Sequence, residues 1–141
     1  MDVKKILSEP HRQWSLFPPA TDISIEQLQS ISPGPLPVEY VSLLRYSNGG
    51  EGLLNLPPLY FMLYESEYVY ELNKDEIQRD LYPDLFQFGS NGGLEAIAFY
   101  TRNTDYWPIV MFDPIAGVQS VVTIADNMEE FIQEIGFESV S

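Results

Sequence analysis

The stretch LPVEYVSLLRYSNGGEG, from Leu36 to Gly52, says most about the fold of this chain. Its proline suits the first position of a helix, because the missing N–H would lack a partner there. Tyr40, Val41 and the leucines that follow recur at the spacing of one apolar helical stripe. Asn48 and the glycines after it can take the left-handed conformation that ends a helix. We therefore predict a core helix with an abrupt end.

Two further helices flank the strands. Ser24 can cap one of them, with Ile23 packing on Leu28, and this helix should end near Ile31. Asp126 can cap the last helix, with a glutamate at its third position. The apolar residues of the last helix follow helical spacing: Met128, Phe131, Ile132 and Ile135.

The remaining elements are short apolar runs and one acidic segment. Ser66 begins a helical region whose buried side we predict to be Val69, Leu72, Ile77 and Leu81. The strand-length runs are residues 53–54, 59–64, 85–88, 95–100, 108–112 and 118–124. Because short turns separate them, the simplest arrangement is a mainly antiparallel sheet packed by helices, which is an α+β fold.

Length and composition are those of one globular domain. A chain of 141 residues with 45% hydrophobic residues can bury a core without disulfides. We place the domain at residues 23–141, with residues 1–22 as an N-terminal lead-in packed on it. The lead-in lacks the apolar run of a secretion signal. No segment has the roughly 20 apolar residues of a membrane span, and we expect a cytoplasmic protein.

The net charge of −14, from 21 acidic and 7 basic residues, excludes some classes of partner. Nucleic acids and anionic membranes bind through Lys and Arg, which are scarce here, so we expect neither partner. Two interpretations of the charge remain open. It either keeps the protein soluble or steers it toward a basic partner.

The residues give little support to catalysis or to metal binding. His11 is the only histidine and the chain has no cysteine, so zinc sites and nucleophiles with a histidine base lack their residues. The glycines after Asn48 follow a helix, whereas a phosphate-binding loop precedes one. We expect no catalytic residue, cofactor or metal. A pair of carboxylates acting as acid and base stays an alternative.

Two groups of residues are candidates for binding a partner. The first is an acidic series with an interleaved tyrosine: Glu65, Glu67, Tyr68, Glu71, Asp75 and Glu76. Glu67 and Glu71 share one helical face, where a cationic partner could offset their repulsion. The second group is Tyr106 and Trp107, which can anchor a partner. The open alternatives are a solvated acidic face and aromatic rings folded back on the core.

The chain resembles the SMI1/KNR4 family, also called the SUKH superfamily, from about residue 24 to residue 136. The resemblance rests on four segments in order: LPVEYVSLLRYSNGGEG, FQFGSNGGLEAIAFY, PIVMFD and DNMEEFIQEI. In the first segment it implies structural roles for Leu36, Pro37, Tyr40, Leu44, Asn48, Gly49 and Gly50. It also implies a non-enzymatic α+β domain, in bacteria commonly an immunity protein that binds and neutralises a cognate toxin, often a nuclease.

Three functional hypotheses follow. The first is a cytoplasmic immunity-type protein that presents an acidic face to a basic toxin domain. The second is a regulatory or scaffold protein of the same fold, as the fungal members of the family suggest. The third is a small hydrolase that uses carboxylates. The oligomeric state stays open.

Overall fold

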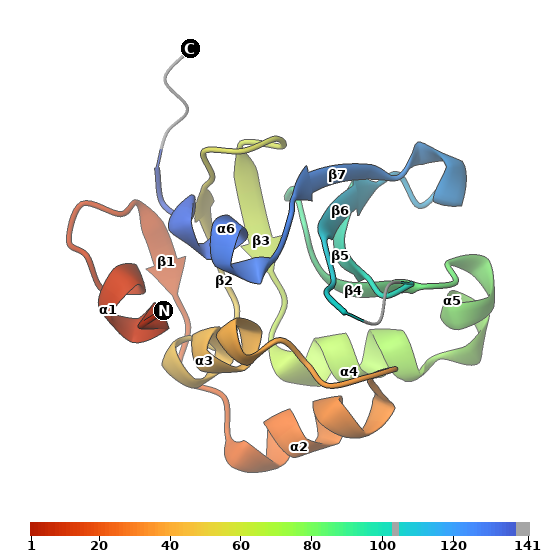
Figure 1. The fold of residues 1–141 in the computed structure, drawn as a ribbon, viewed down its shortest axis with the longest axis horizontal. Helices are drawn as coiled ribbons and strands as arrows, with labels where there is room; N and C mark the ends of the chain where they lie inside the picture. Colours follow the sequence, from red (N-terminus) through yellow and green to blue (C-terminus); the bar gives the residue numbers. More distant parts are fainter. Residues whose placement is uncertain (103–104, 138–141) are drawn as a thin grey trace.

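Seven strands form one antiparallel sheet in which each strand pairs with the next in the sequence, in the order β1 to β7 (Figure 1). This count holds for residues 1–102 and 105–137, which the computed structural model describes. The strands are β1 (Trp14–Leu16), β2 (Gly50–Leu53), β3 (Tyr60–Leu63), β4 (Leu85–Ser90), β5 (Ala96–Tyr100), β6 (Ile109–Phe112) and β7 (Val122–Ala125). The predicted α+β fold with a mainly antiparallel sheet is confirmed.

The described helices pack around this sheet. They are α1 (Val3–Leu7), α2 (Asp22–Ile31), α3 (Val38–Tyr46), α4 (Ser66–Lys74), α5 (Glu76–Leu81) and α6 (Met128–Gln133), with a 3-10 turn η1 (Val118–Ser120) before β7. In Figure 1, α2, α3 and α4 lie along one end of the sheet, and α6 lies in front of β2 and β3. None of the helices in the described part is both long and apolar enough to cross a bilayer.

Helix α3 carries the centre of the core, as its sequence predicts. Tyr40, Leu43 and Leu44 are buried, and the Tyr40 ring meets Phe88 and Phe99 edge-on at 5.3 and 5.2 Å. The proline stands at the N-cap, one position before the first helical residue. Among the residues after the helix, positive φ angles occur at the two glycines and not at Asn48, which corrects the prediction for that asparagine.

Strands β4, β5 and β6 are apolar on both faces. One face joins the main core through residues such as Phe88, Ile97 and Phe99. The other face forms a second cluster, composed of Leu85, Ala96, Ala98, Val110 and Phe112. A strand covered on both sides is a continuous apolar run, which explains why the sequence shows these strands without alternation.

Both predicted helix caps are wrong, one by three positions and the other by one. Helix α2 is capped by Thr21, whose Oγ1 accepts from the N–H of Ser24 at 3.1 Å. Ser24 is buried, and its Oγ accepts from the hydroxyl of Ser66 in α4 at 3.1 Å. Ile23 is 68% exposed and forms no staple with Leu28. Asn127, not Asp126, caps α6.

The prediction of which side chains are buried in the acidic helical region is correct only for the first part of that region. Val69 is buried, but Ile77 and Leu81 are 69% and 56% exposed. The reason is a break at Asp75, which ends α4 and caps α5, so the helical period does not continue across it. Asn73 is buried instead and joins α4 to β4 through hydrogen bonds to the backbone of Gln87.

The N-terminal segment contributes a helix and an edge strand that we did not predict. Val3 and Leu7 of α1 are buried, and β1 pairs with β2. Arg12 reaches the end of α6, where its Nη1 donates to three carbonyl oxygens, those of Ile132, Gln133 and Ile135, at 3.3, 3.2 and 2.7 Å. A cation is favourable at a helix C-terminus, so this arginine fastens the N-terminal segment to the last helix.

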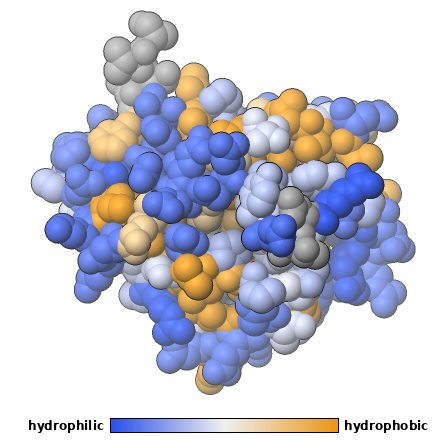
Figure 2. All heavy atoms as spheres, viewed as in Figure 1, coloured by the Kyte–Doolittle hydropathy of each residue, from blue (hydrophilic) through white to orange (hydrophobic). Residues whose placement is uncertain are grey.

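The far end of the sheet exposes apolar side chains. Residues 118–120 form a 3-10 turn, so the predicted strand begins only at Val122. Ile115, Val118 and Val122 are exposed around this turn. Figure 2 shows apolar residues gathered over β7 and the turn before it, on a face that is otherwise mostly hydrophilic.

Candidate functional site

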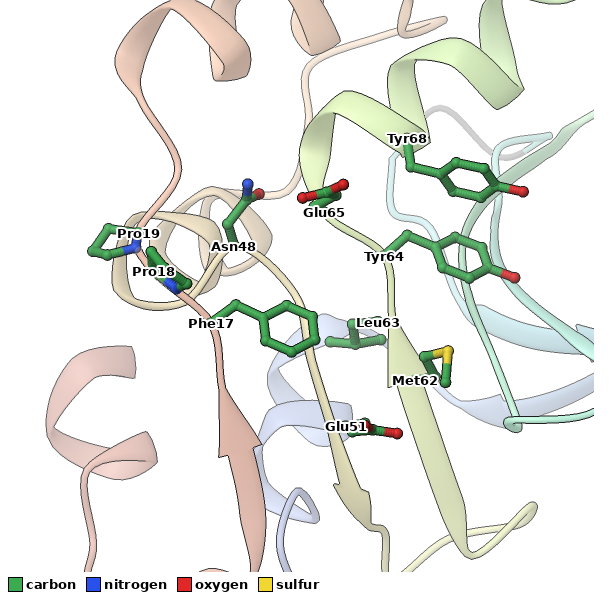
Figure 3. Close-up of a pocket in the computed structure, with 10 residues that line it drawn as sticks. All are labelled: Phe17, Pro18, Pro19, Asn48, Glu51, Met62, Leu63, Tyr64, Glu65 and Tyr68. Atoms are coloured by element: carbon green, nitrogen blue, oxygen red, sulfur yellow. The ribbon is translucent and has the colours of Figure 1, made fainter.

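A groove of about 540 Å³ lies where the end of β3, the start of α4 and the segment after β1 meet. Figure 3 shows the residues that line it: Phe17, Pro18, Pro19, Asn48, Glu51, Met62, Leu63, Tyr64, Glu65 and Tyr68. One wall is Phe17 with the two prolines, and the opposite wall is the tyrosine pair. Glu65 and Glu51 lie toward opposite ends.

The segment SNGG that follows α3 holds the first wall. Ser47 is buried, and its Oγ accepts from the N–H of Phe17 at 2.8 Å and donates to the carbonyl of Gly49 at 2.6 Å. The N–H of Asn48 donates to the carbonyl of Pro18 at 3.0 Å. The helix exit therefore fixes the path of the segment from Phe17 to Pro19.

The side chain of Asn48 holds the second wall. Its Oδ1 accepts from the N–H of Ser66 at 2.8 Å and so caps α4 in place of a residue next to that helix. Its Nδ2 donates to the Glu67 carboxylate at 3.1 and 3.2 Å. Glu65 occupies the N-cap position but makes no capping bond, and its side chain lines the groove instead.

Gly49 is required where α3 passes into β2. Its φ is +96°, and a Cβ at this position would collide with the carbonyl oxygen of Leu63. Only glycine accommodates both conditions without strain. The close approach of this backbone to β3 brings the asparagine within reach of α4.

Strand alternation decides which side chains of β3 are exposed beside the groove. Phe61 and Leu63 are buried, whereas Met62 and Tyr64 between and after them are partly exposed. Because directly opposed residues of antiparallel strands share a face, Glu51 of β2 stands beside Met62 of β3. The sheet face turned away from the core thus supplies both an apolar and an acidic side chain.

Two tyrosine contacts shape the groove and its edge. The rings of Tyr64 and Tyr68 meet edge-on at 4.8 Å, and Tyr68 is 49% exposed. Partial burial raises the pKa of Tyr64, and its hydrogen bond with Ser90 opposes this. The Tyr60 hydroxyl donates to Glu51 at 2.9 Å, and this bond raises the pKa of Tyr60.

Comparison with known families decides the identity of the domain. The family model described as SMI1 / KNR4 family (SUKH-1) matches residues 19–134. The chain belongs to the SMI1/KNR4 family. Comparison with curated proteins finds no match. The SUKH family is generally non-catalytic and is associated with immunity proteins. The SUKH match includes the groove from Pro19 to Tyr68.

The structure of this SUKH domain divides the predicted acidic series. Glu65 and Tyr68 line the groove, and Glu67 adjoins it through Asn48. The remaining acids lie outside the lining. Glu71 pairs with Lys74 at 2.9 Å, so a cation of the same helix offsets its charge. Asp75 caps α5, and Glu76 is exposed on that helix.

Tyr106 and Trp107 lie apart from the groove, in a second hollow beside the loop before α3. Trp107 is half-buried, with its ring 5.8 Å from that of Phe99, while Tyr106 is 56% exposed. The tryptophan thus packs on the core, and the tyrosine is accessible to a partner.

Seven lining residues were not predicted as site residues: Phe17, Pro18, Pro19, Glu51, Met62, Leu63 and Tyr64. Three of them, Met62, Leu63 and Tyr64, belong to the run YFMLY, in which every residue is apolar or aromatic, so its sequence does not reveal the exposed face. Glu51 follows the NGG motif. Its polar side chain within a strand was the one available signal that this residue faces outward.

The groove carries negative charge and no basic side chain among its lining residues. Elsewhere, ion pairs engage Arg12 with Glu9, Arg45 with Asp22 and Lys74 with Glu71. Within residues 1–102 and 105–137, no group of three His, Asp or Glu side chains is arranged to hold a metal ion. The groove therefore combines aromatic surface with carboxylates that have no cationic neighbour in its lining.

Proposed function

We propose that this protein is a cytoplasmic immunity-type protein that neutralises a toxin domain by direct binding. The groove at the start of α4 is the docking site in this proposal. Family membership supports an immunity role, because immunity proteins are associated with the SUKH family. The partner in this proposal is a basic protein domain, and a nuclease toxin fits because such domains carry Lys and Arg for phosphate.

The observation that carries the proposal is the meeting of aromatic and acidic side chains in one groove. Tyr68, Tyr64 and Phe17 offer rigid contact area of the kind found at binding hot spots. Glu51 and Glu65 lie at its two ends and favour a cationic surface. The backbone of both walls is held by hydrogen bonds from the SNGG segment, so little backbone freedom remains to be lost on binding.

The net charge supports the same mechanism. With a charge of −14, the protein attracts a basic domain over distances comparable to the Debye length, about 8 Å at physiological salt. The association rate should then fall steeply with added salt, while dissociation depends on the groove contacts.

Co-expression with the toxin encoded by the neighbouring gene tests this function. The wild-type protein should restore growth of cells that express the toxin, and a Tyr68→Ala and Glu65→Gln double variant should restore it poorly. A Glu76→Gln variant is the matched control, because it removes one acid outside the groove. Absence of rescue by the wild-type protein against every adjacent toxin would favour the regulatory or scaffold role.

A further inference from the structure

The groove also indicates which side chain a partner presents to it. We propose that it receives an arginine from an extended segment of the partner, with the guanidinium paired to Glu65 and stacked on Tyr68. An apolar residue beside that arginine then contacts Phe17 and Met62. This inference rests on the proposed function and specifies the chemistry of the same site.

Glu65 is the carboxylate available for this contact. It is exposed, and no side-chain hydrogen bond engages it among the described residues. It stands at the N-cap position of α4, but Asn48 caps that helix, since its Oδ1 accepts from the N–H of Ser66. The carboxylate is thereby left to line the groove, between Asn48 and the tyrosine pair (Figure 3).

The aromatic wall favours arginine over lysine. Tyr68 packs edge-on against Tyr64 at 4.8 Å and an angle of 79°, and about half of its surface stays exposed. A planar, weakly hydrated guanidinium stacks on such a ring and pairs with a carboxylate at the same time, whereas a compact ammonium is more strongly hydrated.

The charge around the groove is negative and favours a cation. Glu51 and Glu65 line it, and Glu67 adjoins it. The N-terminus of α4 offsets only part of this, with a partial charge of about +0.5. No basic residue is present in the lining, so no cationic side chain of the lining competes with a cation from the partner.

Two synthetic peptides test the proposal. One is acetyl-Gly-Leu-Arg-Leu-Gly-amide, and the other replaces the arginine with citrulline, its neutral isostere. Each is titrated into the full ¹⁵N-labelled chain and followed by NMR. The arginine peptide should shift the backbone signals of Asn48, Glu65 and Tyr68. The citrulline peptide should bind about tenfold more weakly, since it loses both the ion pair and the cation–π contact.

Three variants assign the effect to the groove. Glu65→Gln and Tyr68→Leu should each weaken binding of the arginine peptide about three- to fivefold, and Glu76→Gln should leave it unchanged. Equal binding of the two peptides would overturn the proposal. So would an equal loss in all three variants, or shifts confined to the apolar surface around Val122.

The outcome can be separated from that of the proposed function. If the toxin is neutralised in cells but the arginine peptide leaves the groove signals unchanged, the arginine inference fails and the immunity role stands. If the peptide binds as expected but no neighbouring toxin is neutralised, the groove recognises arginine in another setting.

Discussion

Asn48 joins the family motif to the acidic helix, so replacing it tests how the groove is built. Asn48→Ala removes the cap on Ser66 and the hydrogen bonds to Glu67. Loss of a helix cap costs about 1 kcal/mol. The bonds to an exposed carboxylate add roughly 0.5–1 kcal/mol after allowance for solvent. We expect the free energy of unfolding to fall by about 1.5–2 kcal/mol and the melting temperature by roughly 6 °C.

Asn48→Asp separates the two contributions. A carboxylate keeps the cap on Ser66 but places a second negative charge beside Glu67, for about 1 kcal/mol of repulsion. Only ionised carboxylates repel each other, so the loss is present at neutral pH and shrinks in acid, where carboxyl groups become protonated. The double variant Asn48→Asp with Glu67→Gln should recover most of the stability that the repulsion costs.

Urea denaturation at pH 7 and at pH 4, in low and high salt, measures these effects. The reasoning would be refuted by an Asn48→Ala variant within 0.3 kcal/mol of the wild type at about 0.1 M salt. It would equally be refuted if the stability lost in Asn48→Asp were the same at both pH values, at both salt concentrations and with Glu67→Gln added.

Three further predictions follow from single residues. Tyr40→Phe should change stability at pH 7 by less than about 1 kcal/mol, because the buried hydroxyl makes no hydrogen bond to any described residue. Burial raises the pKa of Tyr40 above its ordinary value near 10. The wild type should therefore lose stability as pH rises above about 10, and the phenylalanine variant should lose less. Thermal melts at pH 9 and pH 11 measure this difference. Gly49→Ala should cost more than about 2 kcal/mol in urea denaturation, whereas Gly117→Ala, at a similar φ of +85° with open space around it, should cost only about 1 kcal/mol. Arg12→Leu should cost about 3 kcal/mol because three carbonyl oxygens lose their donor, and Arg12→Lys should recover part of it; a loss equal in both variants in thermal melts would contradict this account.

The order of elements could be predicted because their signals are local. Helix α3 shows its apolar stripe in nine consecutive residues, and α6 shows the same spacing in Met128, Phe131 and Ile132. The turn at Ser90–Gly93 and the proline pair before β3 separate strands that pair with their neighbours in the chain. A meander needs no information from distant residues, so its topology follows from these signals.

The candidate site was only partly predictable. Tyr68 and Glu65 were found from an acidic series, and the structure places both in the groove. Lys74 stands three positions after Glu71, a spacing that permits their ion pair, but the prediction did not use it. The prediction also continued the helical period across Asp75, where the helix breaks. Charge and spacing describe one segment, but the availability of a carboxylate depends on which neighbour already binds it.

The sequence alone determined the family, the helices with clear periodicity and the antiparallel order of the strands, because residues within one turn or one hairpin carry that information. Tertiary structure decided the groove. Asn48 caps a helix that begins 18 positions later, and Arg12 caps one whose last carbonyls lie more than 100 positions away. The uniformly apolar run YFMLY acquires an inner and an outer face only when the core forms against one side. Such contacts depend on proximity in space, which local spacing does not encode.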